Sequence, residues 1–120
     1  MGKNVIQEKS YKFAVDVIKT YQLLKKTHSE YDLFRQFLRS GTSIGANVQE
    51  AAAAQSRKDF LSKVYISFKE ARETLYWINL LIDTSYLALP HSKELKSKCE
   101  ELIRILSSIT KTTSETMSKK

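Results

Sequence analysis

The sequence predicts an all-α fold, an antiparallel up-down-up-down four-helix bundle forming a single domain over residues 1–120. Three observations predict it. Four segments repeat apolar residues every three or four positions, the period of a helix with one packed face. No segment shows the strict alternation of a half-buried strand. Three glycines and one proline are too few for a turn-rich β fold. The short connections favour antiparallel neighbours.

The first helix is expected over residues 5–26 and the second over residues 33–54. Between them, Ser29 or Asp32 is expected to cap the second helix. The apolar positions of the first helix fall on one face, which is expected to pack on the core. They are Ala14, Val17, Ile18, Tyr21 and Leu24.

The second helix contains Gly41 and Gly45, each of which costs about 1 kcal/mol relative to alanine inside a helix. The helix could stop near Ser40 and restart with Thr42 or Ser43 as its cap. We favour a helix that runs through both glycines, with or without a kink. Two glycines spaced by four residues let a partner helix approach closely.

The third helix, residues 57–83, is expected to begin at a capping box formed by Ser56 and Asp59. Its expected core seam is Phe60, Val64, Phe68, Ala71, Leu75, Ile78 and Ile82. A second apolar stripe lies beside the seam, made of Leu61, Tyr65, Tyr76 and Leu80 and widened by Trp77 and Leu81. One bundle core needs one seam per helix, so the second stripe predicts contacts between copies of the chain. The alternative is that loops cover it. The interface candidates are Tyr65, Tyr76, Trp77 and Leu80.

The fourth helix is expected over residues 92–112, after Pro90, which cannot sit inside a helix. Ser92 is its expected N-cap. The expected core positions are Leu95, Cys99, Leu102, Leu106 and Ile109. Beyond Thr110 the chain is rich in Thr, Ser and Lys, so we expect the last turns to fray.

The charge balance indicates a partner class. Lys and Arg outnumber Asp and Glu by 20 to 13, for a net charge of +7, which favours polyanions such as RNA, DNA or an acidic protein surface. The alternative is that the charges only solvate helix faces. The nucleic-acid candidates are Lys9, Lys12, Lys19, Lys25, Lys26, Arg57, Lys58 and Lys63. Lys58, Lys69 and Arg72 are expected on more than one face, so no single basic stripe is predicted.

The sequence offers no catalytic constellation. His28 and His91 have no Cys or acid at ligand spacing, so no metal site is expected. Cys99 has no evident base beside it, and as a lone cysteine it cannot form an internal disulfide, which favours a reducing cytoplasm. No signal peptide is visible and no apolar run is long enough to cross a membrane. We therefore expect no enzyme activity, no cofactor and no membrane partner.

Polar residues inside the second helix form the clearest signature. Arg39 and Asn47 lie about two turns apart, and Asn47 and Glu50 are neighbours on the helix surface. We expect a buried network that fixes helix register, joining them to Glu70, Glu73 or Arg72 of the third helix. The alternative is a ligand site. The full predicted network is Arg39, Ser43, Asn47, Glu50, Glu70 and Glu73.

The same stretch, Ser43-Ile-Gly-Ala-Asn-Val-Gln-Glu50, resembles the 23S rRNA intervening-sequence protein family, whose pattern runs approximately Arg, three small or apolar residues, then Ser-Ile-Pro-Ser-Asn-Ile-Ala-Glu-Gly. The matching residues are Arg39, Ser43, Ile44, Asn47, Val48 and Glu50, followed by the basic and aromatic stretch 56–60 and the helix 67–75. The resemblance covers nearly the whole chain. Gly45 and Ala51 depart from the usual proline and glycine, and the first helix lacks the usual tryptophan.

The resemblance implies a small bacterial four-helix bundle without enzymatic activity that assembles into a homopentameric ring. A related branch, the accessory protein of diversity-generating retroelements, forms a basic barrel that associates with nucleic acid and a reverse transcriptase. We therefore expect a cytoplasmic homo-oligomer that binds RNA or DNA through its basic surface. The alternative is a protein-interaction scaffold or accessory subunit with no direct contact to nucleic acid.

Overall fold

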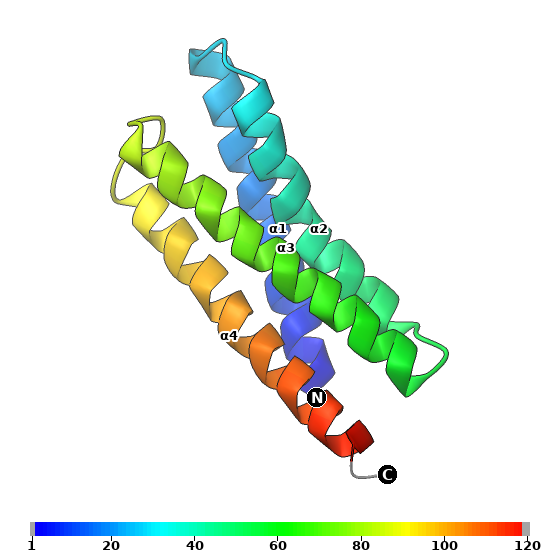
Figure 1. The fold of residues 1–120 in the computed structure, drawn as a ribbon. Coiled ribbons are helices and arrows are strands. Elements are labelled where there is room, and N and C mark those ends of the chain that lie inside the picture. The colour runs from blue at the N-terminus through cyan, green and yellow to red at the C-terminus, as the bar shows by residue number, and fades with distance from the viewer. Residues whose placement is uncertain (1, 119–120) are drawn as a thin grey trace.

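The computed structural model describes residues 2–118, with side chains from Val5 onward, and consists of four helices. These are α1 (Gly2–Thr27), α2 (Asp32–Ala52), α3 (Arg57–Asp83) and α4 (His91–Ser118). Consecutive helices lie side by side and run in opposite directions (Figure 1). The described part of the chain contains no strand, and the all-α four-helix prediction is confirmed. The bundle is elongated, with extents of 53 × 23 × 21 Å.

The helix α2 runs without interruption through Gly41 and Gly45, as expected. A Cβ atom at Gly41 would lie 2.8 Å from both Cγ atoms of Val17 on α1. A Cβ atom at Gly45 would lie 3.3 Å from the carbonyl oxygen of Ser10. A side chain at Gly41 would therefore clash with Val17, and one at Gly45 would be tight against the α1 backbone, so both glycines allow α1 and α2 to pack closely.

The buried seam of α3 differs from the predicted one. It consists of Val64, Ser67, Ala71, Thr74, Ile78 and Leu81, whereas the predicted members Phe60, Phe68, Leu75 and Ile82 are only partly buried. Two seam positions are held by the hydroxyl residues Ser67 and Thr74 instead of large apolar ones. Their burial is tolerated because each hydroxyl donates a hydrogen bond. The Oγ of Ser67 donates to the carbonyl oxygen of Ile44 on α2 at 2.8 Å, and the Oγ1 of Thr74 donates to that of Glu70 at 2.7 Å.

The helix boundaries agree with the predictions within a few residues, except at the C-terminal end. There α4 continues to Ser118, past the predicted end at residue 112. The polar side chains of this segment bond back to their own helix: the Oγ1 of Thr116 donates to the carbonyl oxygen of Thr112 at 2.9 Å. Such bonds satisfy the hydroxyl groups within the helix, so a segment with few apolar residues can still be helical.

One of the three predicted caps is confirmed. The Oγ of Ser56 accepts the backbone N–H of Asp59 at 3.0 Å and caps α3. Neither Ser29 nor Asp32 caps α2; the carboxylate of Glu30 accepts the N–H of Leu33 instead. Ser92 does not precede α4 but lies buried within its first turn.

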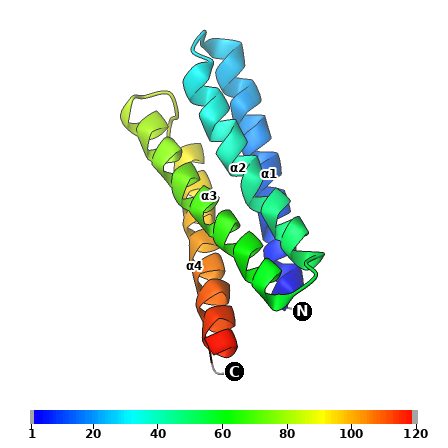
Figure 2. The same cartoon turned by 45° about the vertical axis from the view of Figure 1, so that its right-hand side comes forward.

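The four helices do not enclose the core evenly. Contacts are extensive between α1 and α2, α2 and α3, and α3 and α4, and much sparser between α1 and α4. Turning the molecule shows the α1–α2 pair and the α3–α4 pair as two hairpins joined mainly through α2 and α3 (Figure 2). The α1–α4 side is therefore the open side of the bundle.

Candidate functional site

Arg39 is the centre of a polar cluster on the outer surface of α2 and α3. Its guanidinium donates to the carboxylate of Glu73 and lies 3.4 Å from that of Glu70. The indole N–H of Trp77 donates to the same Glu73 oxygen at 2.9 Å. The cluster therefore ties α2 to α3 and fixes the orientation of Trp77, a contact that the sequence analysis did not anticipate.

The charges of this cluster shift its titration. The hydrogen bond from Trp77, followed by the interaction with Arg39, holds the pKa of Glu73 below its usual range. The hydrogen bond to Glu73 raises the pKa of Arg39. The Arg39 side chain is 50% exposed, so the expectation of a buried network is wrong. The cluster is a surface tie between two helices.

The other members of the predicted network make separate contacts. The hydroxyl of Ser43 donates to the carbonyl oxygen of Arg39 at 2.7 Å, and the amide of Asn47 donates to that of Ser43 at 2.9 Å. Glu50 forms an ion pair with Lys63 at 3.2 Å. Asn47 and Glu50 do not join the Arg39 cluster, because their side chains bond within α2 or to the start of α3.

The four predicted interface residues do not share one environment. Trp77 and Leu80 are partly buried, whereas Tyr65 and Tyr76 are 49% and 58% exposed. Phe68 stacks beside the ring of Tyr65, and Trp77 contacts the ring of Tyr76 edge-on. The two tyrosines are thus exposed rings held in place by their own subunit.

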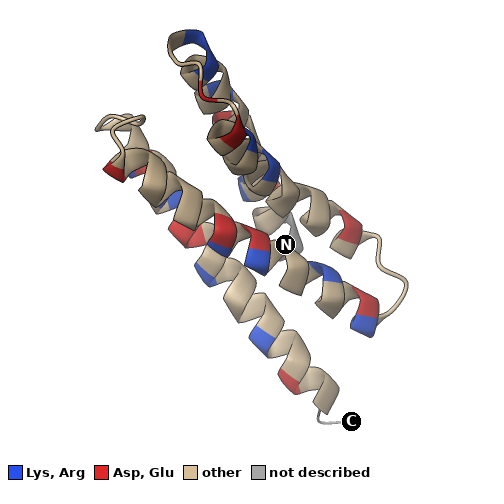
Figure 3. Cartoon of the chain, turned by 45° about the horizontal axis from the view of Figure 1, so that its top comes forward, with Lys and Arg blue, Asp and Glu red and all other residues tan. Residues whose placement is uncertain are grey.

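The predicted basic residues divide by their partners. Lys9 pairs with Glu101 on α4, and Lys63 pairs with Glu50. Among residues 5–118 the other six form no ion pair; they are Lys12, Lys19, Lys25, Lys26, Arg57 and Lys58. Basic segments are visible on each hairpin rather than in one continuous area (Figure 3).

One group of cations does share a face. Lys58, Lys69 and Arg72 are all exposed on the side of α3 opposite its buried seam, so the expectation that they lie on different faces is wrong. Their separations of eleven and three residues are both close to whole turns of a helix. Lys69 and Arg72 were missed as candidates, although counting the residues between them would have revealed the common face.

A second surface, here called the α1–α2 face, has almost no charge. Shallow depressions run along it, lined by Tyr11, Ala14, Ile18 and Tyr21 of α1 and by Leu38, Thr42, Gly45 and Ala46 of α2. Charged side chains reach it only at one end, from Lys25 and Lys26. Tyr11 is 68% exposed and Ile18 is also exposed. The face combines small and large apolar groups on a surface open to solvent.

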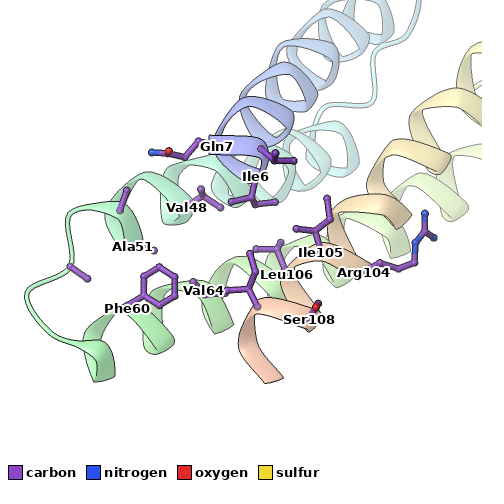
Figure 4. A pocket seen from close by; sticks show the side chains of 14 residues that line it. Ile6, Gln7, Val48, Ala51, Phe60, Val64, Arg104, Ile105, Leu106 and Ser108 are labelled. Atoms are coloured by element: carbon purple, nitrogen blue, oxygen red, sulfur yellow. The ribbon is translucent and has the colours of Figure 1, made fainter. Parts of the chain in front are cut away.

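An apolar groove of about 850 Å³ opens at the end of the bundle where α1 starts and α4 ends. Figure 4 shows Ile6, Val48, Phe60 and Leu106 around its centre. Arg104 is at its rim, on α4. The groove follows from the sparse contact between α1 and α4.

Cys99 and the histidines have structural contacts. Burial raises the pKa of Cys99 to about 12, and its Sγ contacts the carbonyl oxygen of Ala71 at 3.4 Å. His28 packs against Phe34 and Tyr86, and His91 bonds to Thr20 across the α1–α4 side. Within residues 2–118 no cluster of three potential metal ligands occurs, and none of the helices there is long and apolar enough to cross a membrane.

The family model described as 23S rRNA-intervening sequence protein matches residues 2–108. The chain belongs to this family. No curated protein matches it. A solved crystal structure from Bacteroides thetaiotaomicron, described as a protein of unknown function from the S23 ribosomal protein family, is 44% identical. It matches with a TM-score of 0.89 over 92% of this chain and 99% of its own.

Membership of the 23S rRNA-intervening sequence family confirms the resemblance recognised in the signature around Asn47. The matched region contains α1, α2 and α3, the Arg39 cluster, and α4 as far as residue 108. Because the related structure is itself described as having unknown function, the comparison establishes family and fold. The biochemical role must be argued from the surface of the bundle.

Proposed function

We propose that this protein is a non-enzymatic, homo-oligomeric bundle that binds RNA or DNA through basic surface residues. The observation that carries the proposal is the set of exposed cations without carboxylate partners among residues 5–118, on a chain with a net charge of +7. Unpaired surface cations are available to phosphates, whereas a cation already in an ion pair must first give up its partner. The proposed binding is dominated by phosphate contacts.

The test is a gel-shift or fluorescence assay with RNA and DNA at low salt. We expect affinity to fall steeply between about 50 mM and about 200 mM salt, because phosphate binding releases counterions. Absence of binding to any RNA or DNA at the lower salt concentration would exclude this function. Lys12→Gln with Lys19→Gln should weaken binding more than Lys9→Gln with Lys63→Gln, the matched control, whose lysines are already in ion pairs.

Self-association is the second part of the proposal, with a ring of five copies as the expected assembly. We assign one contact surface to the α1–α2 face rather than to the four residues predicted on α3. Interface centres are depleted of charge, and this face is almost uncharged between Tyr11 and Leu38. The exposed face of α3 carries Lys58, Lys69 and Arg72, which would lose their hydration in a contact.

Light scattering tests the assembly. A ring of five predicts a mass five times the 13.8 kDa of one chain, and a mass near that of one chain at micromolar protein would exclude it. Ile18→Lys should reduce the mass because it places a charge on the α1–α2 face. Leu23→Lys is the matched control, since Leu23 is exposed on α1 but does not line that face.

The second candidate function is a protein-interaction scaffold or accessory subunit, for example beside a nucleic-acid enzyme such as a reverse transcriptase. The apolar groove lined by Phe60 and Leu106 favours it, since large apolar recesses commonly receive partner side chains. A scaffold predicts partners that remain bound after nuclease treatment in a pull-down. Partners lost on nuclease treatment would favour the nucleic-acid function.

A further inference from the structure

The outer edge of α3 combines aromatic rings and cations in one line. The residues Lys58, Ser62, Tyr65, Lys69, Arg72 and Tyr76, here called the α3 ridge, follow one another at steps of four and three. Such steps keep side chains on one side of a helix. All six are exposed, and they lie opposite the buried seam that includes Ala71 and Ile78. The ridge therefore faces solvent along most of the helix.

The electrostatic character of the ridge is uniformly positive. Within residues 5–118 none of its three cations forms an ion pair. Glu70 and Glu73, which directly follow Lys69 and Arg72 in the sequence, interact with Arg39 on α2. The ridge is thus complementary in charge to a phosphate backbone.

The two tyrosines add a second kind of contact. Their rings are about half exposed, and each has an aromatic neighbour beside it, Phe68 for Tyr65 and Trp77 for Tyr76. The Nζ of Lys69 lies 5.6 Å from the centre of the Tyr65 ring, so ring and cation share one location. Eleven residues of helix separate the tyrosines, about 16 Å along the axis. At about 3.4 Å per stacked nucleotide this equals roughly five nucleotides.

We propose that a single-stranded segment of nucleic acid lies along the α3 ridge, with bases stacked on Tyr65 and Tyr76 and phosphates contacted by Lys58, Lys69 and Arg72. This inference rests on the proposed function and specifies the ligand and its position. Exposed rings on a helix can stack only on bases that are free of a duplex, whereas the cations alone would serve either form. The ridge therefore distinguishes single strands from duplexes.

The experiment measures binding of a fluorescently labelled twelve-nucleotide single strand and of the duplex of the same sequence by anisotropy at low salt. Tyr65→Leu with Tyr76→Leu should weaken single-strand binding at least tenfold, because each stacked base contributes substantially, and should leave duplex binding within about twofold. Tyr31→Leu is the matched control, because Tyr31 is 45% exposed, close to the 49% of Tyr65, and lies outside both the ridge and the α1–α2 face. Its variant should bind both forms as the original protein does.

Several outcomes separate this inference from the function on which it rests. If the protein binds nucleic acid but the double tyrosine variant binds single strands normally, the ridge is overturned and the function stands. If the original protein binds no nucleic acid, the function fails and the ridge fails with it. If the double variant loses oligomeric mass in light scattering, the tyrosines contact a second copy and the ridge is overturned. Circular dichroism of each variant establishes that the helices persist.

Discussion

The two contacts that α1 makes inside the bundle are built by different means. Toward α2 it packs closely on two glycines, with the Val17 side chain against Gly41 and the Ser10 carbonyl against Gly45. Toward α4 it is tied by separate polar contacts. These are the Lys9–Glu101 pair at 3.2 Å, the Asp16–Lys98 pair at 3.0 Å and the Thr20–His91 bond at 3.0 Å.

The difference shows where this small bundle is rigid and where it is open. A close-packed contact has no spare volume, so even one added methyl group lowers the stability of the fold. Exposed ion pairs contribute about 0–1 kcal/mol each and are screened by salt. The apolar groove, lined by Ile6 of α1 and Leu106 of α4, lies on the α1–α4 side. We infer that α1 separates from α4 more readily than from α2.

The largest expected effect comes from filling the close contact. Gly41→Leu places a side chain where even a Cβ would lie 2.8 Å from Val17, which is itself fully buried and stiff. The free energy of unfolding should fall by about 3 kcal/mol, measured by urea denaturation followed by circular dichroism. Gln36→Leu is the control, since Gln36 is exposed on the same helix and should change stability by less than about 0.5 kcal/mol. Equal stability of the two variants would contradict the close contact.

Of the two interpretations that the sequence left open for Gly41 and Gly45, the favoured one, a continuous helix closely approached by a partner helix, is what the structure has. The sequence did not identify α1 as that partner. It did predict the family, the start of α3 and most of the core of α4. The seam of α3 was misplaced because hydrophobicity alone ranks Phe68 above Ser67. The buried position of Ser67 depends on the carbonyl oxygen of Ile44 on another helix, which no local pattern reveals.

The candidate site was predicted less completely than the fold. Arg39, Glu70 and Glu73 were named together, but the indole bond of Trp77 to Glu73 depends on side-chain rotamers. Asn47 was expected to reach across helices, yet its amide is satisfied within α2. The α3 ridge was readable from residue spacing and was missed because lysines and tyrosines were assigned to separate functions.

Removing the ion pairs between α1 and α4 should lower stability less than Gly41→Leu does. The loosening should be confined to the α1–α4 side of the bundle. Lys9→Gln with Asp16→Asn eliminates both ion pairs between α1 and α4, and the free energy of unfolding should fall by about 1 kcal/mol. Cys99 provides the local measurement. Its buried thiol, with a pKa raised to about 12, should react slowly with iodoacetamide and faster when α4 opens.

The matched control for this variant is Arg35→Gln, which removes an ion pair of the same exposed kind within α2. It should leave alkylation of Cys99 unchanged. An unchanged alkylation rate in the double variant would show that the ion pairs do not hold α1 against α4. A loss of stability as large as that of Gly41→Leu would contradict the contrast between the two contacts.

The tie at Lys98 should also depend on pH. Hydrogen bonds to Asp16 and then Glu94 raise the pKa of Lys98 above its ordinary value. Protonated Lys98 therefore stabilises the fold fully below about 10.4, the pKa of lysine in the unfolded chain. This stabilisation is lost as pH rises through the higher pKa that Lys98 has in the folded protein. The difference in unfolding free energy between the original protein and Lys98→Gln should shrink over this range. A difference that stays constant to the highest pH would exclude the tie.

The smallest expected effect concerns the surface contact between Arg39 of α2 and Glu73 of α3. This contact involves neither of the two helix contacts that α1 makes. The pKa of Glu73 is lower in the folded protein than in the unfolded chain. Ionised Glu73 therefore stabilises the fold above the unfolded pKa of about 4.3, and this stabilisation is lost as pH falls through the lower folded pKa. Trp77 is the single tryptophan and donates to Glu73, so its fluorescence should change over that acidic range. Glu73→Gln keeps an acceptor for the indole without a charge, and its fluorescence should be insensitive to pH there. If the fluorescence of both proteins follows the same acid titration, the signal comes from another group. That outcome would contradict the prediction that protonation of Glu73 changes the fluorescence of Trp77.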